Sequence, residues 1–110
     1  MSEKPLPEDS AARKEVPMYS GLFAYFPDAL AAIAHLSFTG NQKHNPGQPL
    51  HWSRDKSSDH LDCIARHLAG AGTYDADGIL HDIMLAWRAN ANLQIKLEEL
   101  YGLPKPPGAV

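Results

Sequence analysis

The chain has little cysteine, no excess of positive charge and no long apolar run, and each shortage excludes a class of protein. Its single cysteine, Cys63, has no partner for an internal disulfide, so a reducing compartment fits best. A formal net charge of −3 excludes the basic field that holds nucleic acid polymers. No apolar run approaches the roughly 18 residues of a membrane span, and the N-terminus lacks an apolar signal core. We therefore expect a soluble, cytoplasmic protein without a membrane or nucleic acid partner.

Proline-rich, polar segments mark both ends of the chain. Residues 1–17 contain three prolines and predict a flexible N-terminal arm. Residues 103–110 contain three more, and because proline lacks an amide donor this tail cannot continue a helix. Residues 18–102 are long enough for one folded domain.

The apolar periodicity of this domain predicts three helices and no strand. They run from Pro27 to Gly40, from about residues 57–59 to Gly70, and from Asp77, as the cap, to Tyr101. The fold class is therefore all-α, a small helical bundle.

The apolar residues of the first and third helices indicate how the bundle packs. Leu30, Ile33, Ala34 and Phe38 form a helical stripe that we expect to face the core. The long apolar face of the third helix exceeds what one small core can cover. We therefore expect a homodimer or a higher homo-oligomer.

The connection between the first two helices, residues 41–56, is too long and too rich in rings for a plain helical turn. Its cations Lys43, Arg54 and Lys56 would grip phosphates, or would be ordinary surface charges. Its tryptophan, Trp52, would either pack the loop onto the bundle or stack on a planar ligand. Both alternatives remain open for each residue type, and the segment is a candidate binding loop.

Histidine and aspartate concentrate in one part of the chain. All six histidines lie in residues 35–81, and six aspartates lie in residues 55–82. Imidazole and carboxylate groups are ligands for divalent metals and serve as bases in phosphoryl chemistry. The alternative for the second helix is a solvated face beside a small buried cysteine, with His67 stabilising the helix C-terminus.

Several short runs, taken in order, carry a family resemblance. They are FTGNQKHN (38–45), HW (51–52), LDCIARHL (61–68), DG (77–78) followed by His81, and AWR (86–88). Over roughly residues 19–100 the chain resembles the small dATP/dGTP diphosphohydrolases of bacteriophages, which are similar to the MazG-type all-α nucleotide pyrophosphohydrolases.

This resemblance implies metal-dependent hydrolysis of dGTP, and also of dATP, to the deoxynucleoside monophosphate and pyrophosphate. In phages that replace adenine by 2-aminoadenine, such an enzyme supplies dGMP for diaminopurine deoxynucleotide synthesis. A phage-encoded protein would act in the host cytoplasm.

The metal ligands implied by the resemblance must differ from those of MazG-type enzymes. Those enzymes hold magnesium with Glu-x-x-Glu and Glu-x-x-Asp, whereas this chain has no glutamate between Glu15 and Glu98. We therefore expect histidine and aspartate ligands and a divalent ion such as Mn²⁺, Co²⁺ or Mg²⁺. The expected metal ligands are Asp62, His67, Asp77 and His81.

The other site residues follow from the same resemblance. We expect His67, His81 and Asp62 to be catalytic, and the substrate-binding residues to be Lys43, Asn45, Trp52, Arg54, Lys56 and Arg66. Four of these are cations for the phosphates, while Trp52 or Asn45 would contact the purine.

Two other functions use the same residues. A non-catalytic helical adaptor would dock a protein partner through the 41–56 loop and would need no metal. A phosphohydrolase that removes one or all three phosphates would differ from the pyrophosphohydrolase only in its products.

Overall fold

The structure is a computed structural model that describes residues 4–110. Within those residues it contains helices and no strand, which confirms the all-α class. The elements are α1 (Ser10–Arg13), the π-helical turn η1 (Tyr19–Phe23), α2 (Pro27–His44), the 3₁₀ turn η2 (Arg54–Lys56), α3 (His60–Ala69) and α4 (His81–Tyr101). None of the described helices has both the length and the apolar character needed to cross a bilayer.

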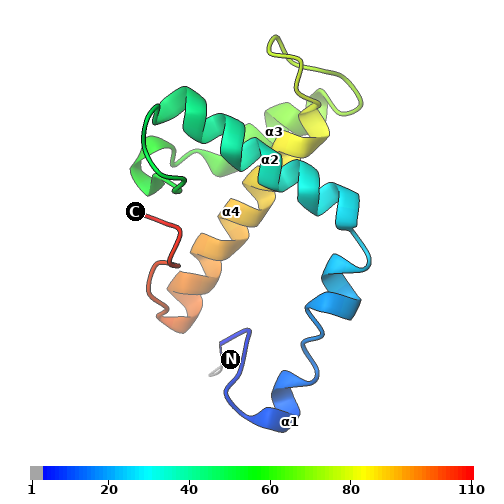
Figure 1. Cartoon of the computed structure of the whole chain (residues 1–110), viewed down its shortest axis with the longest axis vertical. Helices are drawn as coiled ribbons and strands as arrows, with labels where there is room; N and C mark the ends of the chain where they lie inside the picture. The colour runs from blue at the N-terminus through cyan, green and yellow to red at the C-terminus, as the bar shows by residue number, and fades with distance from the viewer. Residues whose placement is uncertain (1–3) are drawn as a thin grey trace.

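Helix α4 is the centre of the arrangement, because both α3 and α2 pack against it. Helix α3 runs antiparallel to α4, as shown by contacts between His67 and His81 at one end and between His60 and Arg88 further along. Helix α2 crosses both at an angle (Figure 1). Helices α2 and α3 therefore both lie on α4, which holds them in place relative to each other.

Helix α2 continues beyond Gly40, the predicted stop, and ends at His44. Its end is set by two buried asparagines: the Asn45 side chain donates to Asn41 Oδ1 at 3.2 Å, and Asn41 donates to the Gln48 carbonyl at 3.1 Å. These bonds satisfy polar groups where the helix gives way to the loop. The first residues of the predicted binding loop are therefore the last turn of α2.

Helix α4 begins at His81, and the prediction that Asp77 caps it is wrong. The Asp75 carboxylate accepts hydrogen bonds from the amides of Asp77 and Ile79, both at 2.9 Å, and so folds these residues into a turn. Gly78, at a φ of 79°, completes that turn in a conformation that glycine adopts easily.

Both terminal segments contain local structure. In the described part of the N-terminal arm, Asp9 caps α1 by accepting from the Ala12 amide at 2.9 Å. At the other end the tail is not helical, as predicted. It pairs with the loop: the Trp52 amide donates to the Gly108 carbonyl at 2.7 Å, and the Val110 amide donates to the Trp52 carbonyl at 2.9 Å.

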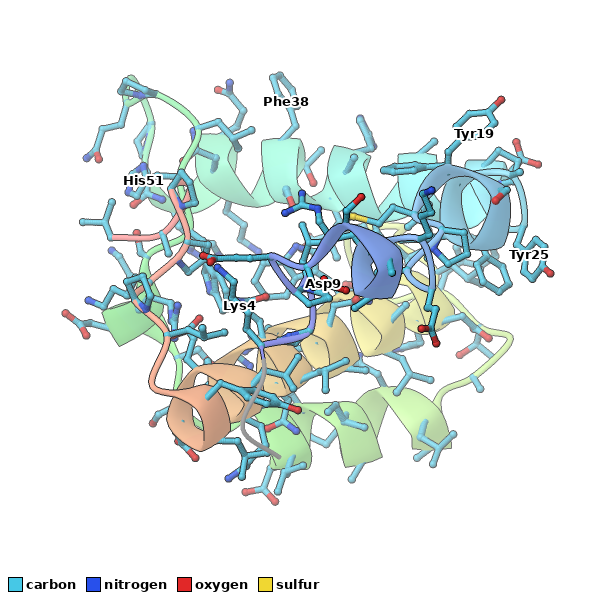
Figure 2. All side chains as sticks on the ribbon, turned by 90° about the horizontal axis from the view of Figure 1, so that it is seen from below. Lys4, Asp9, Tyr19, Tyr25, Phe38 and His51 are labelled. Atoms are coloured by element: carbon cyan, nitrogen blue, oxygen red, sulfur yellow. The ribbon has the colours of Figure 1, made fainter. Side chains whose placement is uncertain are left out.

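The apolar core of the single chain is small. Among residues 4–110 the buried apolar residues of the helices are Cys63 and Ala91, and Pro7 of the N-terminal arm is also buried. The stripe predicted for the first helix is correct in part, because Leu30 and Ile33 turn inward while Ala34 and Phe38 are exposed. Figure 2 shows Phe38 pointing away from the body, on the outer side of α2.

Candidate functional site

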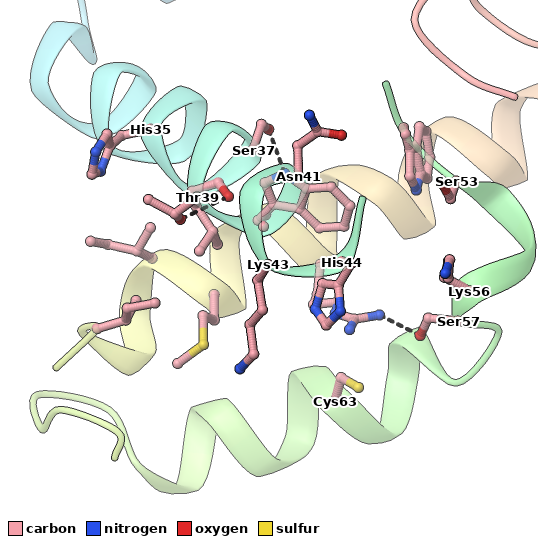
Figure 3. Close-up of a pocket in the computed structure, with 18 of the residues that line it drawn as sticks. His35, Ser37, Thr39, Asn41, Lys43, His44, Ser53, Lys56, Ser57 and Cys63 are labelled. Atoms are coloured by element: carbon pink, nitrogen blue, oxygen red, sulfur yellow. Dashed lines mark hydrogen bonds between the residues drawn. The ribbon is translucent and has the colours of Figure 1, made fainter. Parts of the chain in front are cut away.

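A cleft of about 1260 Å³ lies between α2 and α3, with residues of α4 also in its wall. Its volume exceeds the roughly 300–1000 Å³ of typical ligand pockets, as expected for an open groove. Figure 3 shows Lys43 and His44 pointing from α2 toward α3, and Cys63 pointing from α3 toward α2. We call this space the interhelical cleft.

The interhelical cleft collects most of the residues selected from the sequence. Seven of the ten predicted site residues line it: Lys43, Asn45, Trp52, Lys56, Arg66, His67 and Asp77. They come from the end of α2, the loop, α3 and the turn before α4. Three do not line it, namely Arg54, Asp62 and His81.

Trp52 holds the loop against the helical body. Its ring makes an edge contact with the ring of Trp87 on α4, with centroids 5.8 Å apart and planes 80° apart. The indole of Trp87 in turn donates to Ser37 Oγ on α2 at 2.8 Å. Packing onto the bundle, one of the two roles considered for Trp52, is therefore present. Trp52 also lines the cleft, so stacking on a ligand remains a prediction.

Arg54 forms a structural ion pair outside the cleft. Its guanidinium donates to both carboxylate oxygens of Glu98 on α4, at 2.6 and 3.1 Å, and the two side chains are only 11% and 10% exposed. The Arg54 hydrogen bonds lower the pKa of Glu98. The same guanidinium lies 4.4 Å from the centre of the Trp52 ring. Because its donors face Glu98, this placement does not support the predicted phosphate-binding role of Arg54.

His67 and His81 form a close imidazole pair at the junction of α3 and α4. Their Nδ1 atoms are 3.0 Å apart, so one ring donates and the other accepts when no ion lies between them. Partial burial lowers the pKa of His67 from its ordinary value of 6.5, and the positive charges of His81 and Arg88 lower it further. The neutral form of His67 is therefore favoured more than that of an ordinary histidine.

Gly70 makes room for this pair. A Cβ atom at Gly70 would lie 2.7 Å from Cδ2 of the His81 ring, closer than real Cβ atoms approach. The φ of Gly70 is −93°, which other residues also adopt, so the close ring rather than backbone conformation calls for glycine. The sequence marked Gly70 only as a helix end.

The acid with the clearest link to the histidine pair is Asp75, to which the sequence analysis gave no role. The amide of Ile79, and then that of Asp77, donates to this carboxylate and lowers its pKa, and the charges of His81 and Lys43 act in the same direction. Asp75 lines the cleft and also raises the pKa of His67 slightly. The signal in the sequence was the Asp-x-Asp-Gly turn, whose first aspartate typically binds its own backbone.

Asp77 and Asp62, the two expected oxygen ligands, lie elsewhere. Asp77 forms an ion pair with Lys43 at 3.1 Å at the rim of the cleft, with both side chains largely exposed. Asp62 is exposed on α3 and outside the cleft. Across residues 4–110, no three His, Cys, Asp or Glu side chains lie close enough to hold a metal ion. Of the four expected metal ligands, the structure brings only His67 and His81 together.

Arg88 organises a second polar cluster in the cleft. It donates to Ser57 Oγ at 2.6 Å and contacts His60 Nδ1 at 3.2 Å, which joins α4 to the start of α3. Burial lowers the pKa of His60, and the Arg88 charge lowers it further, so its Nδ1 is available as an acceptor. Arg88 was not among the site residues expected from the sequence.

The charges along the cleft nearly balance. Four cations (Lys43, Lys56, Arg66 and Arg88) face three carboxylates (Asp59, Asp75 and Asp77). A wall of this kind can orient phosphate oxygens, but it offsets little of a triphosphate's negative charge. A polyphosphate ligand would therefore need a bound cation as well.

Comparison of the chain with protein-family models, with curated proteins and with solved structures finds no match.

Proposed function

We propose that the chain is a metal-dependent hydrolase that cleaves dGTP, and also dATP, to the deoxynucleoside monophosphate and pyrophosphate. The observation that carries the proposal is the interhelical cleft, where three cations (Lys43, Lys56 and Arg66) and the imidazole of His67 come together from three separate segments. The resemblance of residues 19–100 to phage diphosphohydrolases selects this reaction among those that such a cleft could support. In a phage with a 2-aminoadenine genome, the product dGMP would feed diaminopurine deoxynucleotide synthesis.

The histidine pair suits two ligands of a divalent ion. Two nitrogens that each bind an ion at about 2.1 Å at a right angle lie about 3.0 Å apart, which matches the 3.0 Å between the Nδ1 atoms of His67 and His81. The lowered pKa of His67 favours the neutral form that binds metal. The bound ion would neutralise phosphate charge and lower the pKa of a water molecule.

The chain's own residues would orient the substrate around this pair. Lys43, Lys56 and Arg66 would hold phosphate oxygens along the cleft. Asp75, whose carboxylate stays charged because its pKa is lowered, would orient the attacking water. Trp52 would stack on the purine from the loop side.

The direct test is incubation of the full chain with each deoxynucleoside triphosphate and with Mg²⁺, Mn²⁺ or Co²⁺, followed by identification of the products. We expect dGMP and pyrophosphate from dGTP, and no turnover when the metal is chelated. Release of orthophosphate would contradict the proposal and favour a phosphohydrolase. The absence of turnover with every metal and nucleotide would favour a protein-docking adaptor.

Adjacent residues of α2 offer a matched pair of variants for the binding site. Lys43 lines the cleft, whereas its neighbour Gln42 is exposed and does not. Lys43→Ala should raise KM for dGTP about tenfold, corresponding to the loss of one charge-assisted hydrogen bond. Gln42→Ala should leave KM unchanged. Equal effects of the two substitutions would show that the phosphates bind elsewhere.

A further inference from the structure

The single chain exposes much more surface than a compact protein of its mass. A folded monomer of this size exposes roughly 6000 Å², whereas this 12.0 kDa chain exposes 7915 Å². Its radius of gyration is 15.5 Å, against about 13 Å for a compact chain of this length. The excess area, about 1900 Å², lies within the roughly 1000–2500 Å² that each subunit of an obligate dimer buries.

Part of the excess exposed area belongs to residues 18–26, which we call the aromatic segment and which precede α2. Six large apolar residues of this segment are exposed, with the exposed fraction running from 37% for Leu22 to 77% for Tyr19; the others are Met18, Phe23, Tyr25 and Phe26. In Figure 2, Tyr19 and Tyr25 lie at the end of the molecule, away from the helical body. Exposure of so many large apolar side chains is typical of a surface that another molecule covers.

The outer face of α2 continues this apolar surface. Ala31, Ala34 and Phe38 follow the i, i+3, i+7 spacing of one helical face, and all three are exposed. The Phe38 ring stacks on the ring of His35, which lines the edge of the interhelical cleft, with centroids 6.3 Å apart. From residue 16 to residue 42, Asp28 is the only charged side chain apart from histidine. A helix that is apolar on its outer face as well as its inner face is normally buried.

The aromatic segment is not free to cover α2 by folding back. Backbone hydrogen bonds run from the Gly21 amide to the Pro17 carbonyl, from the Phe26 amide to the Leu22 carbonyl and from the Leu30 amide to the Phe26 carbonyl. These bonds join η1 to α2 and determine the direction in which the segment leaves the helix. Among the described helices, η1 contacts only α2, and α1 contacts none. Another molecule must therefore cover these rings.

We infer that this surface, residues 18–26 of the aromatic segment with the outer face of α2, binds a second copy of the same chain. The surface is depleted in charge and rich in Tyr, Phe and Met, as the centres of subunit interfaces are. Small residues at its middle, Ala31 and Ala34, allow two α2 helices to approach closely. An antiparallel pair with its two-fold axis near these alanines would place Phe38 of each copy close to Phe26 of the other.

The test is the mass of the full chain in solution at about 10 µM, measured by light scattering, for the wild type and two alanine variants. Ala34 lies at the centre of the proposed interface, whereas Ala89 is an alanine on α4 that is also exposed. We expect at least twice 12.0 kDa for the wild type and for Ala89→Glu, and half of that mass for Ala34→Glu. A monomeric wild type would overturn the inference, as would a mass that falls with Ala89→Glu and not with Ala34→Glu.

A second measurement does not depend on how well the glutamate variants fold. The only native thiol, Cys63, is buried, so a cysteine placed on a helix surface can be linked selectively. A short bis-maleimide should cross-link Ala34→Cys chains in pairs and leave Ala89→Cys chains single. The reverse pattern would reject this face. Both measurements are made without nucleotide, so their outcome is independent of the proposed activity.

Discussion

Removal of the Glu98 charge should destabilise the protein far more than removal of the charge beside it on Glu99. Both residues are glutamates in the last turns of α4. Glu98 receives two hydrogen bonds from Arg54 in a pair that is about one-tenth exposed, whereas Glu99 pairs with Lys96 where both side chains are about 60% exposed. The two substitutions therefore compare a shielded ion pair with a solvated one.

The expected magnitude follows from this difference in exposure. Glu98→Gln places an amide donor against guanidinium donors and leaves the Arg54 charge without a counterion. It should cost about 2–3 kcal/mol, less than the 3–5 kcal/mol of a fully buried pair. Glu99→Gln should cost at most about 0.5 kcal/mol.

Urea unfolding at pH 7, followed by circular dichroism, measures both free energies. Because Arg54 lowers the pKa of Glu98, the ion pair stabilises the fold above the ordinary glutamate pKa of 4.5. That stabilisation is lost as the pH falls through the lower folded-state pKa. The difference between wild type and Glu98→Gln should therefore shrink in acid. Equal free energies of unfolding for the two variants at pH 7 would refute the reasoning.

The remaining predictions concern two glycines, the pH dependence of stability and the choice of metal. Gly70→Ala should destabilise the protein by about 1–3 kcal/mol because its Cβ meets the His81 ring. Gly40→Ala, inside α2 with open space around it, should instead stabilise the protein by about 0.5–1 kcal/mol. Free energies of unfolding in urea that change in the same direction for both variants would contradict the placement of the His81 ring. The lowered pKa values of His67 and His60 mean that the unfolded chain binds more protons below pH 6.5. The free energy of unfolding should therefore fall as the pH is lowered below the ordinary histidine pKa of 6.5, and a rise on acidification would be the contrary result. If imidazole nitrogens hold the metal, turnover of dGTP should be faster with Mn²⁺ or Co²⁺ than with Mg²⁺ at equal concentration, and equal or faster turnover with Mg²⁺ would exclude that ligand set.

The existence of the three long helices could be predicted from the sequence, because each repeats apolar residues over several turns. Their ends could not. Helix α2 passes Gly40 because Asn41 and Asn45 bind each other one turn later. Helix α4 begins at His81 rather than near Asp77 because the Asp75 carboxylate accepts hydrogen bonds from the amides of Asp77 and Ile79 and holds them in a turn. Such side-chain choices are decided by nearby geometry rather than by periodicity.

The site was predictable where residues lie at adjoining ends of consecutive helices. His67 and His81 meet because α3 and α4 are antiparallel and residues 70–80 return the chain to the end of α3. The role of Arg54 was not predictable, because its partner Glu98 lies 44 residues away. The exposed position of Asp62 depends on which side of α3 faces α4, and several sides were compatible with its sequence.

The hydrogen bonds between the loop and the tail have a consequence for the order of folding. The packing of α3 on α4 joins helices that are consecutive in the chain. The hydrogen bonds from the Trp52 amide to the Gly108 carbonyl and from the Arg54 amide to the Val110 carbonyl instead join segments that are far apart in the sequence. Closing so large a loop costs more chain entropy than joining consecutive helices, so this wall of the cleft should form after them. Opening of the tail alone would also expose these two amides to exchange with solvent while α3 and α4 remain packed. The cleft would then gain and lose one wall in a local equilibrium of its own.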